Sequence, residues 1–272
     1  MIDISVIIPS YRPKFYIEEC LESLWLQRCD LSRIEVIIVL NGDKEPYYEY
    51  ISKIDGIDKL NVKILHVSEN GVSNARNIGI HESLGKYVIF LDDDDFLSNN
   101  FLQKGLELIS KNPEGVIIQS NSLSFKEGEK EVLYEDYVSK AVFNYKNSKD
   151  FSFLKAKSFF SSSCFKIIPK SILQNIDFDK SIKVSEDALF MFTISKNVKN
   201  IYVEKEMIYY RRCRNESVMN SKVNKIQYFI NCKRFVTSIT KIYFREVGQY
   251  NFLFYINRIA ASFKFLVINF KK

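Results

Sequence analysis

The sequence predicts an α/β protein built around a mostly parallel β-sheet with helices on its faces. Strand-like and helix-like segments alternate four times within the first 112 residues, which implies parallel strands joined by right-handed crossovers. The strand-like segments are runs of consecutive apolar residues, as expected for strands buried on both faces. At 272 residues the chain can form one large domain of this class with a helical extension at its C-terminus.

The elements of the N-terminal half follow from these patterns in chain order. A first strand spans residues 4–9 and stops at Pro9, which has no N–H to donate to a neighbouring strand. Residues 15–26 are predicted as a helix because their apolar positions fall at helical spacing. The segments after it are predicted as a strand at 34–40, a helix near 45–54, a strand at 62–67, a loop entering a helix at 69–79, a strand at 86–91 and a helix near 100–112.

The C-terminal half is less regular. A strand begins at residue 115, and the polar segment 126–150 is expected to form a hairpin or an insertion. A helix is predicted to start at Glu186, with Ser185 well placed to cap it and acids that suit the helix dipole in its first turn. The other predicted elements are a strand at 161–169 that enters a helix, a strand at 201–210, and two closing helices near 223–244 and 250–270.

Four consecutive acids, Asp92 to Asp95, follow the apolar strand at 86–91. In open α/β sheets ligands bind beyond the carboxyl ends of the strands, so these acids lie where a site is expected. Adjacent like charges repel one another, and a divalent cation with oxygen ligands relieves that repulsion. The quartet therefore suits Mg²⁺ or Mn²⁺ carrying phosphate oxygens, and the alternative is a solvated acidic turn that only ends the strand.

Several sequence features that mark particular classes of protein are absent from this chain. The chain lacks both the G-x-G-x-x-G fingerprint and the G-x-x-x-x-G-K-[ST] loop, which argues against NAD enzymes and P-loop NTPases. Its five scattered cysteines include no C-x-x-C, so a disulfide framework or zinc site is not expected and a reducing cytoplasm fits. No signal peptide is visible, and Arg258 and Lys264 interrupt the apolar stretch near the C-terminus. We expect a cytoplasmic protein, either soluble or peripheral at the inner face of the plasma membrane.

Positive charge is concentrated near the C-terminus. Residues 222–272 contain ten Lys or Arg and the single acid Glu246, whereas the preceding residues carry a slight negative balance. A basic tail rich in aromatic residues suggests an anionic membrane surface as a partner, and no nucleic-acid motif accompanies the charge. An apolar stripe recurs at spacings of four and three in the last helix, which suits packing against the body, a homo-oligomer contact or a membrane-surface helix; its members are Phe252, Ile256, Ile259, Phe263, Leu266 and Phe270.

Five short motifs occur in one order along the chain: residues 5–11, residues 35–42, N-G-x-S-x-A-R-N-x-G at 70–79, residues 85–95 with the acid quartet, and Glu186-Asp187. In this order they resemble family 2 glycosyltransferases of the GT-A fold, the inverting type of bacterial surface-polysaccharide synthesis. The resemblance is dense over residues 3–100, thinner over 185–217, and does not cover the tail. It implies a GT-A domain at 1–220, with a nucleotide-sugar-binding half at 1–112 and an acceptor-side half at 113–220. The charge and apolar spacing described above predict a basic amphipathic helical tail at 221–272.

The resemblance also implies an activity and a donor site. Proteins of this family transfer a sugar from a nucleoside diphosphate, here a UDP-sugar, to a hydroxyl of a glycan or lipid-linked glycan with inversion. Asp92, Asp93 and Asp94 correspond to the D-x-D region, with Asp94 and Asp92 on the Mg²⁺ or Mn²⁺ ion and the diphosphate. The other residues implied to bind the nucleotide sugar are Pro9, Ser10, Tyr11, Arg76, Arg211 and Arg212. For Arg76 a structural salt bridge at the mouth of the sheet is the alternative.

Two positions concern catalysis and base selectivity. Asp187 matches the family's general base, with Glu186 beside it orienting the acceptor or the loop; a helix-capping role is the alternative for this pair. The family has an acid pair after the second strand, where this chain has Leu40-Asn41. Because an amide offers both a donor and an acceptor, Asn41 is still expected to bind a pyrimidine edge.

Two other functions remain open at this point. One is a non-catalytic nucleotide-sugar-binding or scaffold subunit of a glycan assembly complex, whose tail recruits a partner enzyme. The other is a sugar-phosphate nucleotidyltransferase, which needs a Gly-rich basic loop after the first strand. The segment Ser10-Tyr11-Arg12-Pro13 is a poor match for such a loop.

Overall fold

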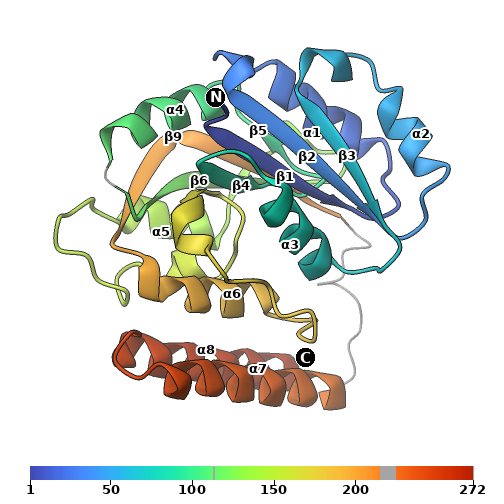
Figure 1. Ribbon diagram of the computed structural model, residues 1–272. Helices are drawn as coiled ribbons and strands as arrows, with labels where there is room; N and C mark the ends of the chain where they lie inside the picture. The colour runs from blue at the N-terminus through green and yellow to red at the C-terminus, as the bar shows by residue number, and fades with distance from the viewer. Residues whose placement is uncertain (113, 215–224, 272) are drawn as a thin grey trace.

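The N-terminal half forms the parallel part of a nine-stranded sheet in the computed structural model, which describes residues 1–112, 114–214 and 225–271 (Figure 1). The parallel strands lie in the order β3-β2-β1-β4, and all three pairings among them are parallel. Their bounds are β1 (Ile4–Ser10), β2 (Ile34–Asn41), β3 (Val62–Val67) and β4 (Tyr87–Phe90). The predicted strands are therefore confirmed within one residue or two.

The strand β1 extends one residue beyond the predicted end, through Pro9 to Ser10. Its pairing with β4 ends where Ile7 faces Phe90, so beyond that point β1 pairs only with β2. The missing N–H of Pro9 therefore falls beyond the end of one ladder, and proline does not stop the strand there.

Helices connect these strands as predicted. They are α1 (Tyr16–Trp25), α2 (Tyr47–Ser52), α3 (Val72–Glu82) and α4 (Phe101–Lys111), with short 3₁₀ helices at Leu31–Arg33 and Ile57–Lys59. Helix α3 packs against β1 and β2. The contact is so close at Gly79 that a Cβ atom there would lie 2.3 Å from Cγ2 of Ile7. This approach places Arg76, one turn earlier on α3, at the mouth of the sheet.

The C-terminal half adds short antiparallel pairings to the sheet, which is therefore mixed, while its long ladders are parallel as predicted. The order continues as β4-β8-β6-β9-β5, with β7 pairing to β6, and only β6 and β9 are parallel to each other in this part. The strands are β5 (Phe96–Leu97), β6 (Val116–Lys126), β7 (Tyr134–Glu135), β8 (Lys166–Pro169) and β9 (Asn200–Cys213). The helices are α5 (Tyr137–Asn144) and α6 (Glu186–Ile194), with 3₁₀ helices at Lys157–Phe160, Lys170–Leu173 and Ser195–Asn197.

Two local predictions in this half were wrong. Only residues 166–169 of the predicted strand at 161–169 are extended, because the segment before them bends and Phe165 has a φ of 67°. Ser185 precedes α6 but has a φ of 66°, and its side chain makes no capping hydrogen bond. Its left-handed backbone is not the extended conformation from which a serine side chain caps a helix.

Two long helices close the described chain: α7 (Lys225–Arg245) and α8 (Phe252–Lys271). They pack against each other, and α6 lies between them and the sheet (Figure 1). The buried ring of Phe254 lies 5.1 Å from the rings of Phe153 and Phe160. The predicted boundary between domain and tail, at residues 220 and 221, lies outside the described residues.

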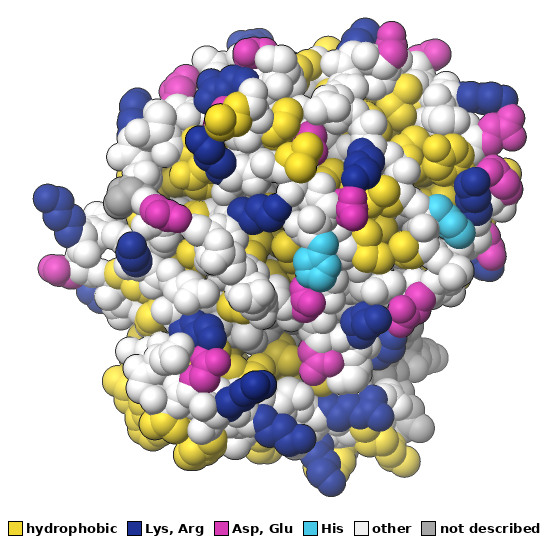
Figure 2. Space-filling model, in the orientation of Figure 1, with side chains coloured by type: hydrophobic (Ala, Val, Ile, Leu, Met, Phe, Trp, Pro, Cys, Tyr) yellow, Lys and Arg dark blue, Asp and Glu magenta, His cyan; other side chains and the backbone are white. Residues whose placement is uncertain are grey.

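Most described members of the apolar stripe predicted for α8 do not face the body of the protein. Phe252, Ile256 and Phe263 are exposed, whereas Ile259 is partly buried. The side chains of Leu266 and Phe270 lie outside the described part of the chain. Figure 2 shows hydrophobic side chains with Lys and Arg among them along the lower edge of the molecule, over these helices. Within the described residues, none of the helices has both the length and the hydropathy needed to cross a bilayer.

Candidate functional site

The acid quartet lies in the loop between β4 and β5, and each of its first three carboxylates contacts a different neighbour. Asp92 accepts a hydrogen bond from Nη2 of Arg76 at 2.9 Å. Asp93 accepts one from the hydroxyl of Ser10 at 2.6 Å. Asp94 pairs with Nε of Arg214 at 2.7 Å. Arg214 was not among the predicted site residues, although it follows the predicted Arg211 and Arg212 by only a few positions.

The fourth acid, Asp95, holds the loop in place. It is buried, and it accepts hydrogen bonds from the hydroxyl of Tyr209 at 2.8 Å and from the backbone N–H of Arg212 at 2.7 Å. Both partners belong to β9, so Asp95 ties the acid loop to the far half of the sheet. The backbone N–H of Asp92 also donates to Tyr209 at 3.2 Å.

The pKa values of Asp93 and Asp94 are raised above their ordinary values. Burial, with repulsion from Asp94 and Asp92, raises the pKa of Asp93 to about 7, although the Ser10 hydroxyl opposes the rise. Burial and repulsion from Asp92 raise the pKa of Asp94 to about 6, against the lowering effect of Arg214. Crowded, poorly solvated carboxylates of this kind attract positive charge.

The quartet offers the oxygen ligands that Mg²⁺ and Mn²⁺ prefer. Within the described residues, no group of three or more His, Cys, Asp or Glu side chains is arranged to hold a metal ion without further ligands. A Mg²⁺ site at a nucleotide commonly uses one or two carboxylates and takes its other ligands from phosphates and water. Asp92 and Asp94 fit that smaller role, and their part in it remains a prediction.

Arg76 joins the acid loop to the second predicted acid pair. Its guanidinium is only 5% exposed, with Nη1 lying 2.7 Å from Oδ1 of Asp187 and Nη2 lying 2.9 Å from Oδ1 of Asp92. Burial opposes the charge, but Asp187 and Asp92 together raise the pKa of Arg76, so it stays a cation. The structural salt bridge considered for Arg76 is thus present, and it connects two parts of the candidate site.

Glu186 and Asp187 begin α6 and differ in their surroundings. Oε1 of Glu186 lies 4.0 Å from Nη1 of Arg76. Burial and the neighbouring Asp187 raise the pKa of Glu186 to about 7, with Arg76 lowering it. Asp187 also accepts hydrogen bonds from Ser162 and Ser163. Sequence reasoning missed both serines, and the run of three serines at 161–163 was the only signal for them.

The residues predicted for the base pocket meet at the ends of β1 and β2. Pro9 and Ser10 are buried, and Tyr11 is 48% exposed beside them. The Asn41 amide donates to the carbonyl oxygen of Ser10 at 2.8 Å and accepts from the N–H of Gly71 at 3.0 Å. Asn41 therefore joins the loops after three strands, and its binding to a base remains a prediction.

Arg211 and Arg212 point in different directions because they are neighbours on one strand. Nη1 of Arg211 lies 3.9 Å from Oδ2 of Asp136. Nε of Arg212 donates to the carbonyl oxygen of Asp94 at 2.9 Å, and its Nη2 pairs with Glu19. Of these two arginines, only Arg212 contacts the acid loop: its side chain binds the backbone oxygen of Asp94, and its backbone N–H binds Asp95.

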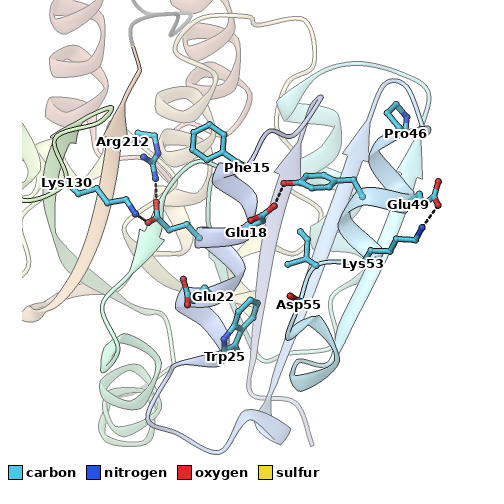
Figure 3. Close-up of a pocket in the computed structure, with 13 residues that line it drawn as sticks. Phe15, Glu18, Glu22, Trp25, Pro46, Glu49, Lys53, Asp55, Lys130 and Arg212 are labelled. Atoms are coloured by element: carbon cyan, nitrogen blue, oxygen red, sulfur yellow. Dashed lines mark hydrogen bonds and ion pairs between the residues drawn. The ribbon is translucent and has the colours of Figure 1, made fainter.

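A groove of about 750 Å³ runs between α1 and α2, with Arg212 and Lys130 at one end (Figure 3). Its lining is acidic and aromatic, and it contains none of the residues of the acid loop and neither member of the Glu186-Asp187 pair. This groove is therefore separate from the candidate active site. The lining residues include Phe15, Glu18, Glu19, Glu22, Trp25, Glu49 and Asp55.

Comparison with known sequences indicates the same family as these motifs. A family model described as Glycosyl transferase family 2 matches residues 5–177. The chain is 28% identical over 230 residues to the minor teichoic acid biosynthesis protein GgaB of Bacillus subtilis, covering 82% of this chain and 25% of that protein. It is 24% identical over 220 residues to the poly(ribitol-phosphate) beta-N-acetylglucosaminyltransferase TarS of Staphylococcus aureus, covering 79% and 36%. The chain thus spans about a quarter to a third of these relatives.

Solved structures share the fold. TarS 1-349 in complex with UDP-GlcNAc superposes with a TM-score of 0.76 at 21% identity, covering 96% of this chain and 72% of that one. The mannosyltransferase PcManGT of Pyrobaculum calidifontis, in complex with GDP-Man and Mn²⁺, gives a TM-score of 0.61 at 12% identity, covering 97% and 69%. At these identities the likeness establishes the α/β fold of the GT-A type. Because the family model matches residues 5–177, more than half of the sequence, the chain belongs to glycosyl transferase family 2.

Proposed function

We propose that this protein is an inverting glycosyltransferase of bacterial cell-surface polysaccharide synthesis, which moves a sugar from a UDP-sugar to a hydroxyl of a glycan or lipid-linked glycan. One observation carries the proposal: Arg76 bridges Asp187 and Asp92 at 2.7 and 2.9 Å. Inverting transfer needs a base on one side of the anomeric carbon and stabilisation of the leaving group on the other. The bridge brings the candidate groups for both roles together.

Asp187 acts as the general base in this mechanism. It takes the proton from the acceptor hydroxyl as the oxygen attacks the anomeric carbon, while the nucleoside diphosphate departs from the opposite face. Arg76 pairs with Asp187, and most of the effect of this base comes from holding the acceptor in line. Glu186, whose pKa lies near 7, orients the acceptor or the neighbouring loop.

The acid loop binds the donor's diphosphate. Asp94 and Asp92 would hold Mg²⁺ or Mn²⁺, which supplies positive charge to the departing diphosphate. Asp93 and Ser10 form the adjoining wall towards the ribose, and their 2.6 Å hydrogen bond fixes both side chains. The complex of TarS with UDP-GlcNAc supports a uridine nucleotide, and that of PcManGT with Mn²⁺ supports the metal.

The closing helices suggest where the protein works. Phe252, Ile256 and Phe263 are exposed on α8, and the surrounding segment carries most of the chain's excess positive charge. We assign this surface to contact with anionic headgroups at the inner face of the plasma membrane, where lipid-linked acceptors are found.

Contact with a second copy of the chain is the alternative, and flotation with phosphatidylglycerol or phosphatidylcholine vesicles separates the two. Binding to the anionic vesicles alone, lost in Phe252→Ser/Ile256→Ser, is the expected result; dimers in solution with no vesicle binding would contradict it.

Nucleotide binding gives the first test of the function. UDP, GDP, CDP and dTDP are added to the purified protein with Mn²⁺ or with EDTA, and the melting temperature is measured. A nucleotide at 100 times its dissociation constant stabilises by roughly 2.7 kcal/mol, which is readily seen. We expect UDP with Mn²⁺ to raise the melting temperature of the wild type but not of Asp94→Ala.

Catalysis is then separated from binding alone. Release of UDP from UDP-GlcNAc is followed for the wild type and for Asp187→Asn, with UDP affinity measured by calorimetry. An enzyme loses turnover in the variant and keeps its affinity for UDP. If wild-type protein binds UDP but turns over no UDP-sugar with any glycan or lipid-linked acceptor, the protein is a binding subunit. If it binds no nucleotide, the proposed function fails altogether.

A further inference from the structure

A short loop between the 3₁₀ helix at 157–160 and β8 contacts the candidate base directly. We call residues 161–164 the serine loop. The Ser163 hydroxyl, which is fully buried, donates to Oδ1 of Asp187 at 2.9 Å. The Ser162 hydroxyl lies 3.3 Å from Oδ2 of the same carboxylate.

These contacts leave the two oxygens of Asp187 unequal. Oδ1 receives both Nη1 of Arg76, at 2.7 Å, and the hydroxyl of Ser163. Oδ2 has only the longer contact with Ser162. The oxygen with fewer donors keeps more of its capacity to accept a proton. Arg76 and the serine loop together therefore leave Oδ2 as the oxygen of Asp187 with the greater remaining capacity to accept a proton.

A buried lysine supports the serine loop from the sheet side. Nζ of Lys166 donates to the carbonyl oxygens of Ser162 and Cys164 at 2.8 and 2.9 Å. Lys166 is the first residue of β8 and is aligned with Gln119 of β6, so its backbone is fixed by the sheet. A buried polar group is costly unless it is hydrogen-bonded, and these two carbonyls accept the hydrogen bonds of Lys166.

A buried arginine of α8 supports the start of the serine loop, mostly through the 3₁₀ helix that precedes it. Nη1 of Arg258 donates to the carbonyl oxygens of Lys157 and Phe160, both at 3.2 Å, and Nη2 lies 3.5 Å from the hydroxyl of Ser161. Arg258 is only 7% exposed, and its Nε finds no hydrogen-bond partner within the described residues. Burying a cation with one unpaired donor is destabilising unless its other hydrogen bonds compensate for the lost hydration.

We infer that α8 is part of the catalytic framework and that Arg258 is a positioning residue for Asp187. Arg258 and Lys166 together hold the serine loop, and the loop holds the base carboxylate through Ser162 and Ser163. The inference rests on the proposed function in one respect, the role of Asp187 as base. It assigns to the C-terminal helices a task besides contact with a membrane or partner.

Hydrogen exchange tests the physical connection without any activity. Exchange is measured by mass spectrometry on the full chain for the wild type, Arg258→Met, Arg258→Lys and the exposed-residue control Arg28→Met. We expect Arg258→Met to speed exchange in residues 157–165 and also in the first turn of α6, with β1 and β2 unchanged. Arg258→Lys should restore part of the protection, because an ammonium group can still reach one carbonyl. Faster exchange confined to α8 and residues 157–160, with α6 as in the wild type, overturns the inference.

Turnover tests the consequence for the base. UDP-GlcNAc hydrolysis with Mn²⁺ is compared in the wild type, Arg258→Met, Ser163→Ala and the double variant, with UDP affinity measured in parallel. Misplacing a reacting group by about 1 Å can cost up to roughly a hundredfold, so we expect kcat to fall about tenfold to a hundredfold with UDP affinity within about twofold. The losses of the two single variants should not add in the double variant, because both act through one loop.

The outcomes separate this inference from the proposed function. Ser163→Ala removes one hydroxyl and keeps the turnover test usable if Arg258→Met does not fold. Unchanged kcat in Ser163→Ala, or fully additive losses, overturns the positioning role even when the wild type is active. If the wild type turns over no UDP-sugar, the proposed function fails, and the exchange measurement still decides whether Arg258 and the first turn of α6 are connected.

Discussion

Replacing Asp94 by asparagine should stabilise the protein at neutral pH when no metal is present. Folding raises the pKa of Asp94 from 3.8 to about 6, through burial and repulsion from Asp92. A tenfold change in proton affinity corresponds to about 1.4 kcal/mol, so keeping this carboxylate charged in the folded state costs about 3 kcal/mol above pH 6. The Asp94 side chain is only 13% exposed, so water relieves little of that cost.

The sign of the pH dependence follows from linkage. Because the folded protein holds the Asp94 proton more tightly than the unfolded chain, the cost is absent well below pH 3.8 and complete above about pH 6. The amide of the substituted asparagine carries no charge at any pH. Asp94→Asn should therefore exceed the wild type by about 3 kcal/mol at pH 7.5 and by only about 1 kcal/mol at pH 4.5.

Urea unfolding in EDTA measures this difference, with fluorescence of the single tryptophan, Trp25, as the signal. The control is Asp150→Asn, an exposed acid for which a change within about 0.5 kcal/mol is expected at both pH values. With Mn²⁺ and UDP added, the wild type should gain stability and Asp94→Asn should not. If Asp94→Asn is no more stable than the wild type at pH 7.5, then the ion pair with Arg214 outweighs burial and repulsion, and our account of the acid loop is wrong.

Three further predictions test other parts of the structure. Asp187→Asn should lower sugar transfer or donor hydrolysis by about 10²- to 10⁴-fold with UDP affinity unchanged, and an equal loss of affinity would argue against a base. Arg76→Met should cost about 3–5 kcal/mol in urea unfolding at neutral pH, because it leaves the carboxylates of Asp92 and Asp187 without their shared buried cation; a cost under 1 kcal/mol would mean that water replaces the guanidinium. Gly79→Ala should cost about 1–3 kcal/mol, since its Cβ would lie 2.3 Å from Ile7; unchanged stability would show that α3 can move away from β1.

The sequence was sufficient for the fold where the signal was local. Apolar runs such as residues 34–40 alternate with segments of helical spacing, and the parallel orientation of β1 to β4 follows from that alternation. The C-terminal half was harder because most of its strand pairings join residues far apart in the sequence. Nothing local shows that β8 inserts between β4 and β6.

The candidate site shows the same division. The acid loop and the Glu186-Asp187 pair were predicted from motifs, and the structure brings them together through Arg76. Ser163 and Arg258 were missed because their roles depend on contacts between residues far apart in the sequence. The helical spacing of apolar residues in α8 could be recognised in the sequence, but that spacing does not show which face of the helix is buried. Phe254 and Arg258 face the body, and the predicted stripe is mostly on the other side.

The aromatic contacts of α8 have a consequence for how the protein is made. Phe254 packs on Phe153, Phe160 and Phe192, all of which are synthesised before it. A nascent chain that has reached the end of β9 contains every strand of the sheet but not yet α7 and α8, so these rings lack their cover of Phe254. The serine loop of such a chain has the hydrogen bonds from Lys166 but not yet the contact with Arg258. The native support of the candidate base is thus complete only once α8 has been synthesised, because Arg258 and Phe254 both belong to that helix.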